Sequence, residues 1–152
     1  MRHLYIDYPT VPESVNKLYF VRGGRKVLST SGRKYKNEFL LSRGNLDAAT
    51  FMQFAPEPEA RYSLTLWFFL RPDRLYNLTY GVNRRVKSPF ADIDTSNMIK
   101  LFEDCISELT GIRDRNNFSI HAHKREAPGG IERVRAILKP LDDEEEWEQT
   151  TD

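Results

Sequence analysis

The chain has 152 residues, 39% of them hydrophobic and 30% charged, which is typical of one soluble globular domain. Its longest apolar run, residues 64–70, is too short to span a bilayer, and no signal-peptide pattern opens the sequence, so we expect neither a membrane span nor export. The single cysteine, Cys105, can form no internal disulfide and favours a cytoplasmic location.

The net charge of +1 is unevenly distributed along the chain. Residues 142–152 carry seven acidic side chains and no basic one, so residues 1–141 hold 23 Lys and Arg against 15 Asp and Glu. A basic body of this kind suggests a polyanionic partner, although solubility alone would account for the same charge. We predict a folded domain over residues 1–141 and a disordered acidic tail over residues 142–152.

The first half of the chain predicts a strand, a hairpin and a helix. Residues 3–8 have a β-like pattern that ends before Pro9. In residues 18–28, two β-like runs flank a pair of glycines, an arrangement typical of a hairpin. A helix then runs towards Phe54, and Gly44 is a point at which it can be interrupted. The candidates for its N-cap are Ser29, Thr30 and Ser31.

The middle and the end of the chain predict three more strands and a long loop. Residues 61–70 are rich in β-branched and aromatic side chains, which favours a central strand. Residues 73–91 contain Asn, Gly and Pro, and we expect a long basic loop there, of a length that is often functional. Residues 118–124 and 132–138 are predicted strands that form a hairpin around Pro128-Gly129-Gly130.

A second helix is predicted over residues 96–110. Asp94 or Ser96 can cap its start, and Gly111 ends it. The resulting order of strand, hairpin, helix, strand, helix, strand and strand predicts the fold class α+β. We expect a single domain with two main helices and a mixed or mostly antiparallel sheet.

Aspartates lie at both ends of this second helix. Asp92 and Asp94 precede its start, and Asp114 follows its end. Clustered carboxylates repel one another unless a cation lies between them, and their hard oxygen ligands suit Mg²⁺ or Mn²⁺. Such ions promote phosphodiester hydrolysis. Lys100, about one turn into the helix, can stabilise the negative charge that develops at the phosphate.

Two questions about this metal site stay open at the level of sequence. A helix of about 14 residues is about 20 Å long, so Asp114 can join Asp92 and Asp94 only if the following loop folds back or a second subunit supplies it. Asp92 and Asp94 can also be ordinary helix caps, and Lys100 with Asp104 an ordinary surface pair.

Two stretches of the sequence carry a resemblance to a known family. One reads Asp94-Thr-Ser96-Asn97-Met-Ile-Lys100-Leu-Phe-Glu-Asp104, followed by Gly111-Ile-Arg113-Asp114. The other reads Pro12-Glu-Ser14-Val-Asn16 with Tyr19, followed by Arg25, Ser29, Gly32 and Tyr35-Lys36. With both in order over about residues 5–138, the chain resembles the RusA-type Holliday junction resolvases, the crossover junction endodeoxyribonucleases of bacteria and phages.

The resemblance implies an activity and a set of roles. Family members are homodimers that nick four-way DNA junctions symmetrically with Mg²⁺-like ions, in recombination and repair, without a nucleotide cofactor. By the same resemblance, Asp92, Asp94 and Asp114 would hold the metal and Lys100 would assist at the phosphate. Asn97 and Asp104 would order the site. The residues expected at branched DNA are Asn16, Arg22, Arg25, Lys26, Arg33, Lys34, Arg84, Arg85 and Lys87.

The chain departs from the family pattern on both sides of the helix. The family often has two acids directly before the Asn, where this chain has Asp94 and Ser96, although a two-residue insertion would match Asp92 and Asp94 to that pair instead. After the helix, one of the paired acids is replaced by Arg113. These departures leave an alternative function open, a RusA-like protein that binds DNA junctions but is catalytically impaired.

Overall fold

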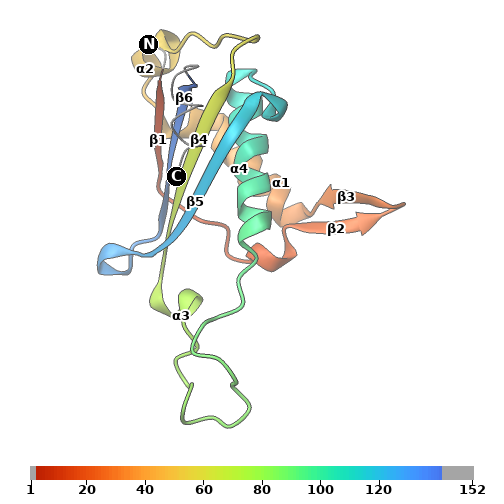
Figure 1. Ribbon diagram of the computed structural model, residues 1–152, viewed down its shortest axis with the longest axis vertical. Helices are drawn as coiled ribbons and strands as arrows, with labels where there is room; N and C mark the ends of the chain where they lie inside the picture. The colour runs from red at the N-terminus through yellow and green to blue at the C-terminus, as the bar shows by residue number, and fades with distance from the viewer. Residues whose placement is uncertain (1–2, 142–152) are drawn as a thin grey trace, which may run out of the picture.

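A four-stranded mixed sheet forms the centre of the computed structural model, which describes residues 3–141. The strand order is β1-β6-β4-β5 (Figure 1). β6 is antiparallel to both β1 and β4, whereas β4 and β5 are parallel. The strands are β1 (Leu4–Tyr8), β4 (Tyr62–Leu70), β5 (Asn117–Glu126) and β6 (Arg133–Pro140).

Two long helices pack on one face of this sheet, and a separate hairpin projects beside them (Figure 1). The helices are α1 (Thr30–Leu41) and α4 (Thr95–Thr110), and the hairpin consists of β2 (Tyr19–Arg22) and β3 (Arg25–Leu28). The short helices are α2 (Ala48–Gln53), α3 (Pro72–Leu75) and the 3-10 turns η1 (Val15–Lys17), η2 (Arg43–Asn45), η3 (Asp114–Asn116) and η4 (Pro128–Gly130). The described residues thus form a single small α+β domain, as predicted.

Local signals set the helix ends as expected. The Ser29 side chain accepts a hydrogen bond from the backbone N–H of Gly32 and caps α1. The predicted interruption occurs at Gly44, whose φ of +64° is left-handed and breaks the helical path. Gly111, with φ of +77°, ends α4 in the same conformation.

The hairpin predicted between β5 and β6 is wrong, because β4 lies between these two strands. Leu64, Leu66, Phe68 and Leu70 of β4 have no exposed surface. A strand buried to this degree occupies the interior of a sheet, with a neighbour at each edge. The Pro-Gly-Gly turn therefore carries the chain past the end of β4.

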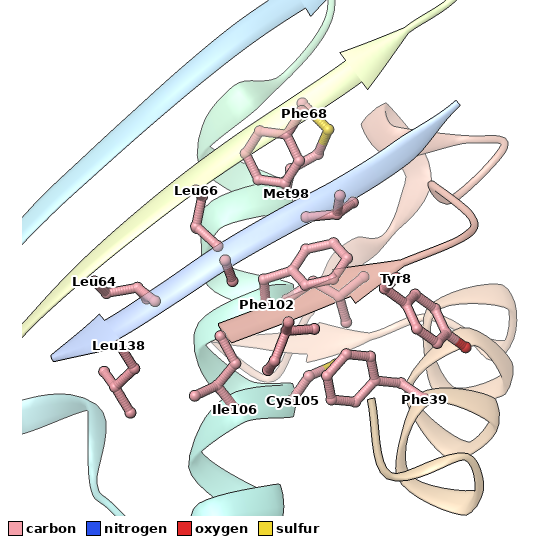
Figure 2. Close-up of a cluster of buried hydrophobic side chains, with 14 of the residues drawn as sticks. Tyr8, Phe39, Leu64, Leu66, Phe68, Met98, Phe102, Cys105, Ile106 and Leu138 are labelled. Atoms are coloured by element: carbon pink, nitrogen blue, oxygen red, sulfur yellow. The ribbon is translucent and has the colours of Figure 1, made fainter. Parts of the chain in front are cut away.

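Aromatic rings connect the sheet to both long helices in the core (Figure 2). Phe102 of α4 is 1% exposed and lies at the centre of this cluster. Its ring centroid is 5.7 Å from that of Tyr35, 6.1 Å from that of Phe39 and 5.7 Å from that of Phe68. Since Phe102 is also on the helix that begins at Asp94, core packing orients the candidate site.

No helix within residues 3–141 combines the length and the apolar character that a membrane span requires. The predicted acidic tail, residues 142–152, lies outside the described residues.

Replacing Phe102 with Ala should lower the free energy of unfolding by about 3–5 kcal/mol, because the change leaves a cavity where three other rings meet. Urea denaturation monitored by circular dichroism measures this loss. The matched control is Leu41→Ala on α1, a side chain that is 86% exposed, which should change stability by no more than about 0.5 kcal/mol. Equal effects of the two substitutions would contradict this description of the core.

Candidate active site

The side chain of Asn16 joins two segments of the chain at the N-terminal end of α4. Its amide nitrogen donates to the backbone carbonyl of Asp92 at 3.1 Å, and its carbonyl oxygen accepts from the backbone N–H of Asp94 at 2.7 Å. In return, the buried Asn97 side chain donates to the backbone carbonyl of Val15 at 3.3 Å. The two stretches that carry the family resemblance therefore meet in space.

Asp94 is the N-cap of α4, as the plain helical interpretation of the sequence expects. Its Oδ1 accepts from the Ser96 hydroxyl at 2.5 Å and from the Asn97 backbone N–H at 3.2 Å. The Ser96 bond, the Asn97 bond and the positive charge of Lys26 lower the pKa of Asp94. The carboxylate is consequently ionised at neutral pH, as a metal ligand must be.

Two lysines converge on the aromatic ring of Tyr19, and the charge of one of them, Lys26, also acts on Asp94. The Nζ atoms of Lys26 and Lys100 lie 5.4 and 5.5 Å from the ring centroid of Tyr19, at cation-π distance. The Tyr19 hydroxyl donates to Asp104 Oδ2 at 3.1 Å, and Lys100 Nζ is 3.9 Å from the same oxygen. The i,i+4 pair expected from the helix is thus present, but it belongs to a larger cluster.

Tyr19 keeps its proton in this cluster. Burial is the main cause that raises the pKa of its hydroxyl, and the charge of Asp104 and the hydrogen bond to it raise it further. The hydroxyl therefore acts as a stable donor that holds the Asp104 carboxylate. The ammonium group of Lys100 thus contacts both the Asp104 carboxylate and the ring of Tyr19.

Asp92 is exposed and lines a shallow pocket of about 320 Å³ next to Asn16. Arg74 forms another wall of this pocket. The Arg74 guanidinium is held by Glu132 at 3.0 Å and by the backbone carbonyl of Pro12 at 2.6 Å. The segment before α4 thus lies between the Asn16 amide and the Arg74 guanidinium, both held in place by hydrogen bonds, and the Asp92 carboxylate is exposed to solvent.

Asp114 lies at the other end of α4. It is exposed at the start of η3, and its negative charge helps raise the pKa of Glu103, an effect dominated by burial of Glu103 itself. Glu103 lies nine residues beyond Asp94, about 14 Å along the helix axis. Asp94 and Asp114 are therefore separated by most of the helix length.

The structure does not bring Asp92, Asp94 and Asp114 together within one subunit. Within residues 3–141, no three His, Cys, Asp or Glu side chains gather closely enough to hold one ion. The loop after α4 turns back only as far as Glu103, whose carboxylate accepts from the Asn117 side chain and lies in the field of Asp114. The two-subunit version of the site stays a prediction.

The donor atoms near the start of α4 nevertheless fit a hard divalent cation in type. Asp94 and Asp92 supply carboxylate oxygens. Asn97 is 4% exposed, and its side-chain carbonyl oxygen has no hydrogen-bond partner among the described residues. An all-oxygen set of this kind suits Mg²⁺ or Mn²⁺ rather than a softer metal, although one subunit alone offers few ligands.

Most residues expected at DNA lie on exposed, projecting segments (Figure 1). The β2-β3 hairpin carries Arg22, Arg25 and Lys26, the first half of α1 carries Arg33 and Lys34, and the loop before α4 carries Arg84, Arg85 and Lys87. Asn16 differs from this expectation, because both polar atoms of its amide are engaged by the Asp92–Asp94 backbone. It positions the acidic segment.

Glu103 is a carboxylate that sequence reasoning missed. It is half-buried, accepts from the Asn117 side chain at 3.5 Å and lies in the field of Asp114. Sequence spacing does not predict that Glu103 and Asp114 are neighbours, because the turn at Gly111 brings them together. The role of Tyr19 was visible only as an aromatic position in the resemblance.

Comparison with protein-family models and with curated proteins found no match for this chain. The resemblance to the RusA-type resolvases therefore stays a prediction that depends on the residues quoted above.

Replacing Ser96 with Ala should raise the pKa of Asp94 towards its ordinary value, because the strongest hydrogen bond to the carboxylate is lost. Titration of the Asp94 side-chain carbon by NMR measures the shift. Since the folded pKa lies below the unfolded one, the stability that Asp94 contributes is present above about pH 4 and is lost as pH falls through the folded pKa.

Ser107→Ala, a change on α4 far from Asp94, is the matched control and should leave the Asp94 titration where it is. The described hydrogen bond would be contradicted if Asp94 titrated identically with and without the Ser96 hydroxyl.

Proposed function

We propose that this protein is a homodimeric, Mg²⁺- or Mn²⁺-dependent endonuclease of the RusA type that nicks four-way or branched DNA junctions. The observation that carries the proposal is the contact between the two resembling stretches. Asn16 forms hydrogen bonds with the backbone of Asp92 and Asp94, which are 76 and 78 residues further along the chain, and so fixes the segment that contains them. A helix cap alone does not need such a long-range clamp.

Each residue of this site has a separate role in the proposed reaction. Asp92 and Asp94 hold the cation, with the Asn97 carbonyl as a further oxygen donor. A bound Mg²⁺ supplies neutralising charge at the scissile phosphate and makes a water molecule more acidic. Lys26 and Lys100 place two ammonium groups where the phosphate gains negative charge during cleavage. Tyr19 and Asp104 keep Lys100 in position.

A second subunit completes the ligand set in this proposal. Asp114 cannot reach Asp94 within one subunit, whereas a two-fold dimer can bring Asp114 of one copy to Asp94 of the other. Two equivalent sites would result, one for each of the two strands that a symmetric resolvase nicks. The requirement for both subunits would also prevent an isolated monomer from cleaving DNA.

The DNA itself would be held mainly through its phosphates. The exposed basic residues lie on three segments: Arg22 and Arg25 on the hairpin, Arg33 and Lys34 on α1, and Arg84, Arg85 and Lys87 on the loop before α4. Contacts of this type fix position without reading sequence. They suit an enzyme that recognises DNA shape. We expect this enzyme in the cytoplasm of a bacterial or phage-infected cell.

The alternative is a junction-binding relative with impaired catalysis. Ser96 stands where the family often has an acid, and its hydroxyl is already used as a donor to Asp94. Arg113 replaces a further acid and is exposed beside Asp114. If both positions are needed as ligands, the protein binds junctions without nicking them.

Asp94→Asn should abolish nicking of a synthetic four-way junction while junction affinity is kept. Asn is as good an N-cap as Asp, so the helix start survives while the anionic ligand is lost. Gel analysis of labelled junctions in Mg²⁺ measures cleavage, and fluorescence anisotropy in EDTA measures binding.

Asp47→Asn is the matched control, because Asp47 caps α2 by accepting from the Thr50 backbone N–H at 2.7 Å and lies away from the site. It should nick at the original rate. Full activity of Asp94→Asn would remove this residue from catalysis, and junction binding without nicking by the unaltered protein would favour the impaired relative.

Mixing two inactive variants tests the shared site. Asp94→Asn and Asp114→Asn should each be inactive alone, whereas a mixture should regain nicking of one strand. In the mixed dimer, one site combines both substitutions and the other combines both intact aspartates. The products are resolved by labelling each junction strand in turn.

If Asp94 and Asp114 acted in the same subunit, both sites of the mixed dimer would lack one ligand and the mixture would stay inactive. That result would contradict the two-subunit site.

A further inference from the structure

A long arm, residues 76–91, projects from the body between α3 and α4 (Figure 1). Its base is closed by an isolated antiparallel bridge between Tyr76 and Phe90. The Asn77 side chain donates to the backbone carbonyls of Ser88 and Phe90, each at 2.9 Å. The arm ends directly before Asp92, so its base is tied to the acidic segment.

Turns order the tip of the arm. The backbone N–H of Tyr80 donates to the Asn77 carbonyl at 3.0 Å, and the N–H groups of Val82 and Asn83 donate to the Thr79 carbonyl at 3.0 and 2.8 Å. Gly81 between them has φ of +86°, a conformation that favours glycine. The backbone of the tip is thus hydrogen-bonded without any cover from the core.

The ordered tip presents apolar side chains to solvent. Leu78, Tyr80 and Val82 are 70%, 51% and 88% exposed, and Phe90 nearer the base is 67% exposed. Such a concentration of exposed apolar surface on one projecting segment marks a binding site. The same segment carries Arg84, Arg85 and Lys87 and contains no acidic residue.

The charge of the arm decides between two kinds of partner. Two arms from two copies of the chain would bring three positive charges against three, which opposes their contact. DNA, in contrast, neutralises this charge through its phosphates. Proteins that combine basic side chains with an apolar wedge insert the wedge between base steps. Insertion costs least where stacking is already interrupted, as it is at a branch point.

We propose that the arm inserts its apolar tip at the branch point of DNA. Leu78, Tyr80 and Val82 stack on the base pairs exposed there, while Arg84, Arg85 and Lys87 hold the flanking phosphates. This inference rests on the proposed function and adds to it the feature by which a branch is distinguished from a linear duplex. Because the arm continues into Asp92, tip binding also sets the distance from the branch to the cut.

Equilibrium binding to a four-way junction and to a linear duplex, in EDTA so that neither is cut, tests this role. The double variant Tyr80→Ala/Val82→Ala should bind the junction about tenfold more weakly, a loss within the range of one stacked base, and should bind the duplex as before. Fluorescence of 2-aminopurine at the branch point should rise with the unaltered protein and not with this variant.

Two comparison variants separate stacking from charge. Arg84→Ala/Arg85→Ala should weaken both DNAs and lower the slope of log affinity against log salt by about two. Leu41→Ala/Met52→Ala removes apolar side chains that are 86% and 82% exposed on α1 and α2, and should leave the junction preference unchanged.

An unchanged junction preference in the Tyr80→Ala/Val82→Ala variant would overturn the proposed role of the arm and leave the nuclease proposal standing. A shift of that variant from dimer to monomer in analytical ultracentrifugation would assign the tip to a contact between subunits and overturn the role as well. Equal affinity of the unaltered protein for junction and duplex would contradict both proposals together.

Discussion

The double hydrogen bond from Asn16 to the backbone of Asp92 and Asp94 is the constraint on which the candidate site depends. An exposed extended segment loses substantial conformational entropy when it is fixed, so some interaction must hold it. Asn16 fixes the segment before α4, and the Asp94 cap fixes its junction with the helix. With both in place, the Asp94 carboxylate lies in the field of Lys26 and the Asp92 carboxylate is exposed to solvent.

The length of α4 then determines how the acids can cooperate. Asp94 lies at its start in the field of Lys26, whereas Glu103 and Asp114 lie nearer its end, close to the Asp104 carboxylate that Tyr19 and Lys100 contact. A helix packed by Phe102 against the sheet cannot shorten this separation. Cooperation of the two groups at one ion would therefore need two copies of the chain, and the proposed activity would depend on a dimer.

The sequence predicted what local chemistry controls and missed what long-range pairing controls. The caps, Gly44 and Gly111 were readable because each acts on its own turn, and β4 was readable from its apolar run. The turn at Pro128-Gly129-Gly130 was also readable, but it does not reveal that β4 separates the strands on either side. The Asn16 clamp was invisible for the same reason, since its partners lie more than 70 residues away.

The most direct test of the central claim is a crystal structure of the protein soaked with Mn²⁺ and recorded at a wavelength where manganese scatters anomalously. We expect an anomalous peak coordinated by Asp94, with Asp114 of a symmetry-related subunit at the same ion. A peak bound elsewhere, or a dimer in which these two aspartates remain apart with no ion at Asp94, would contradict it.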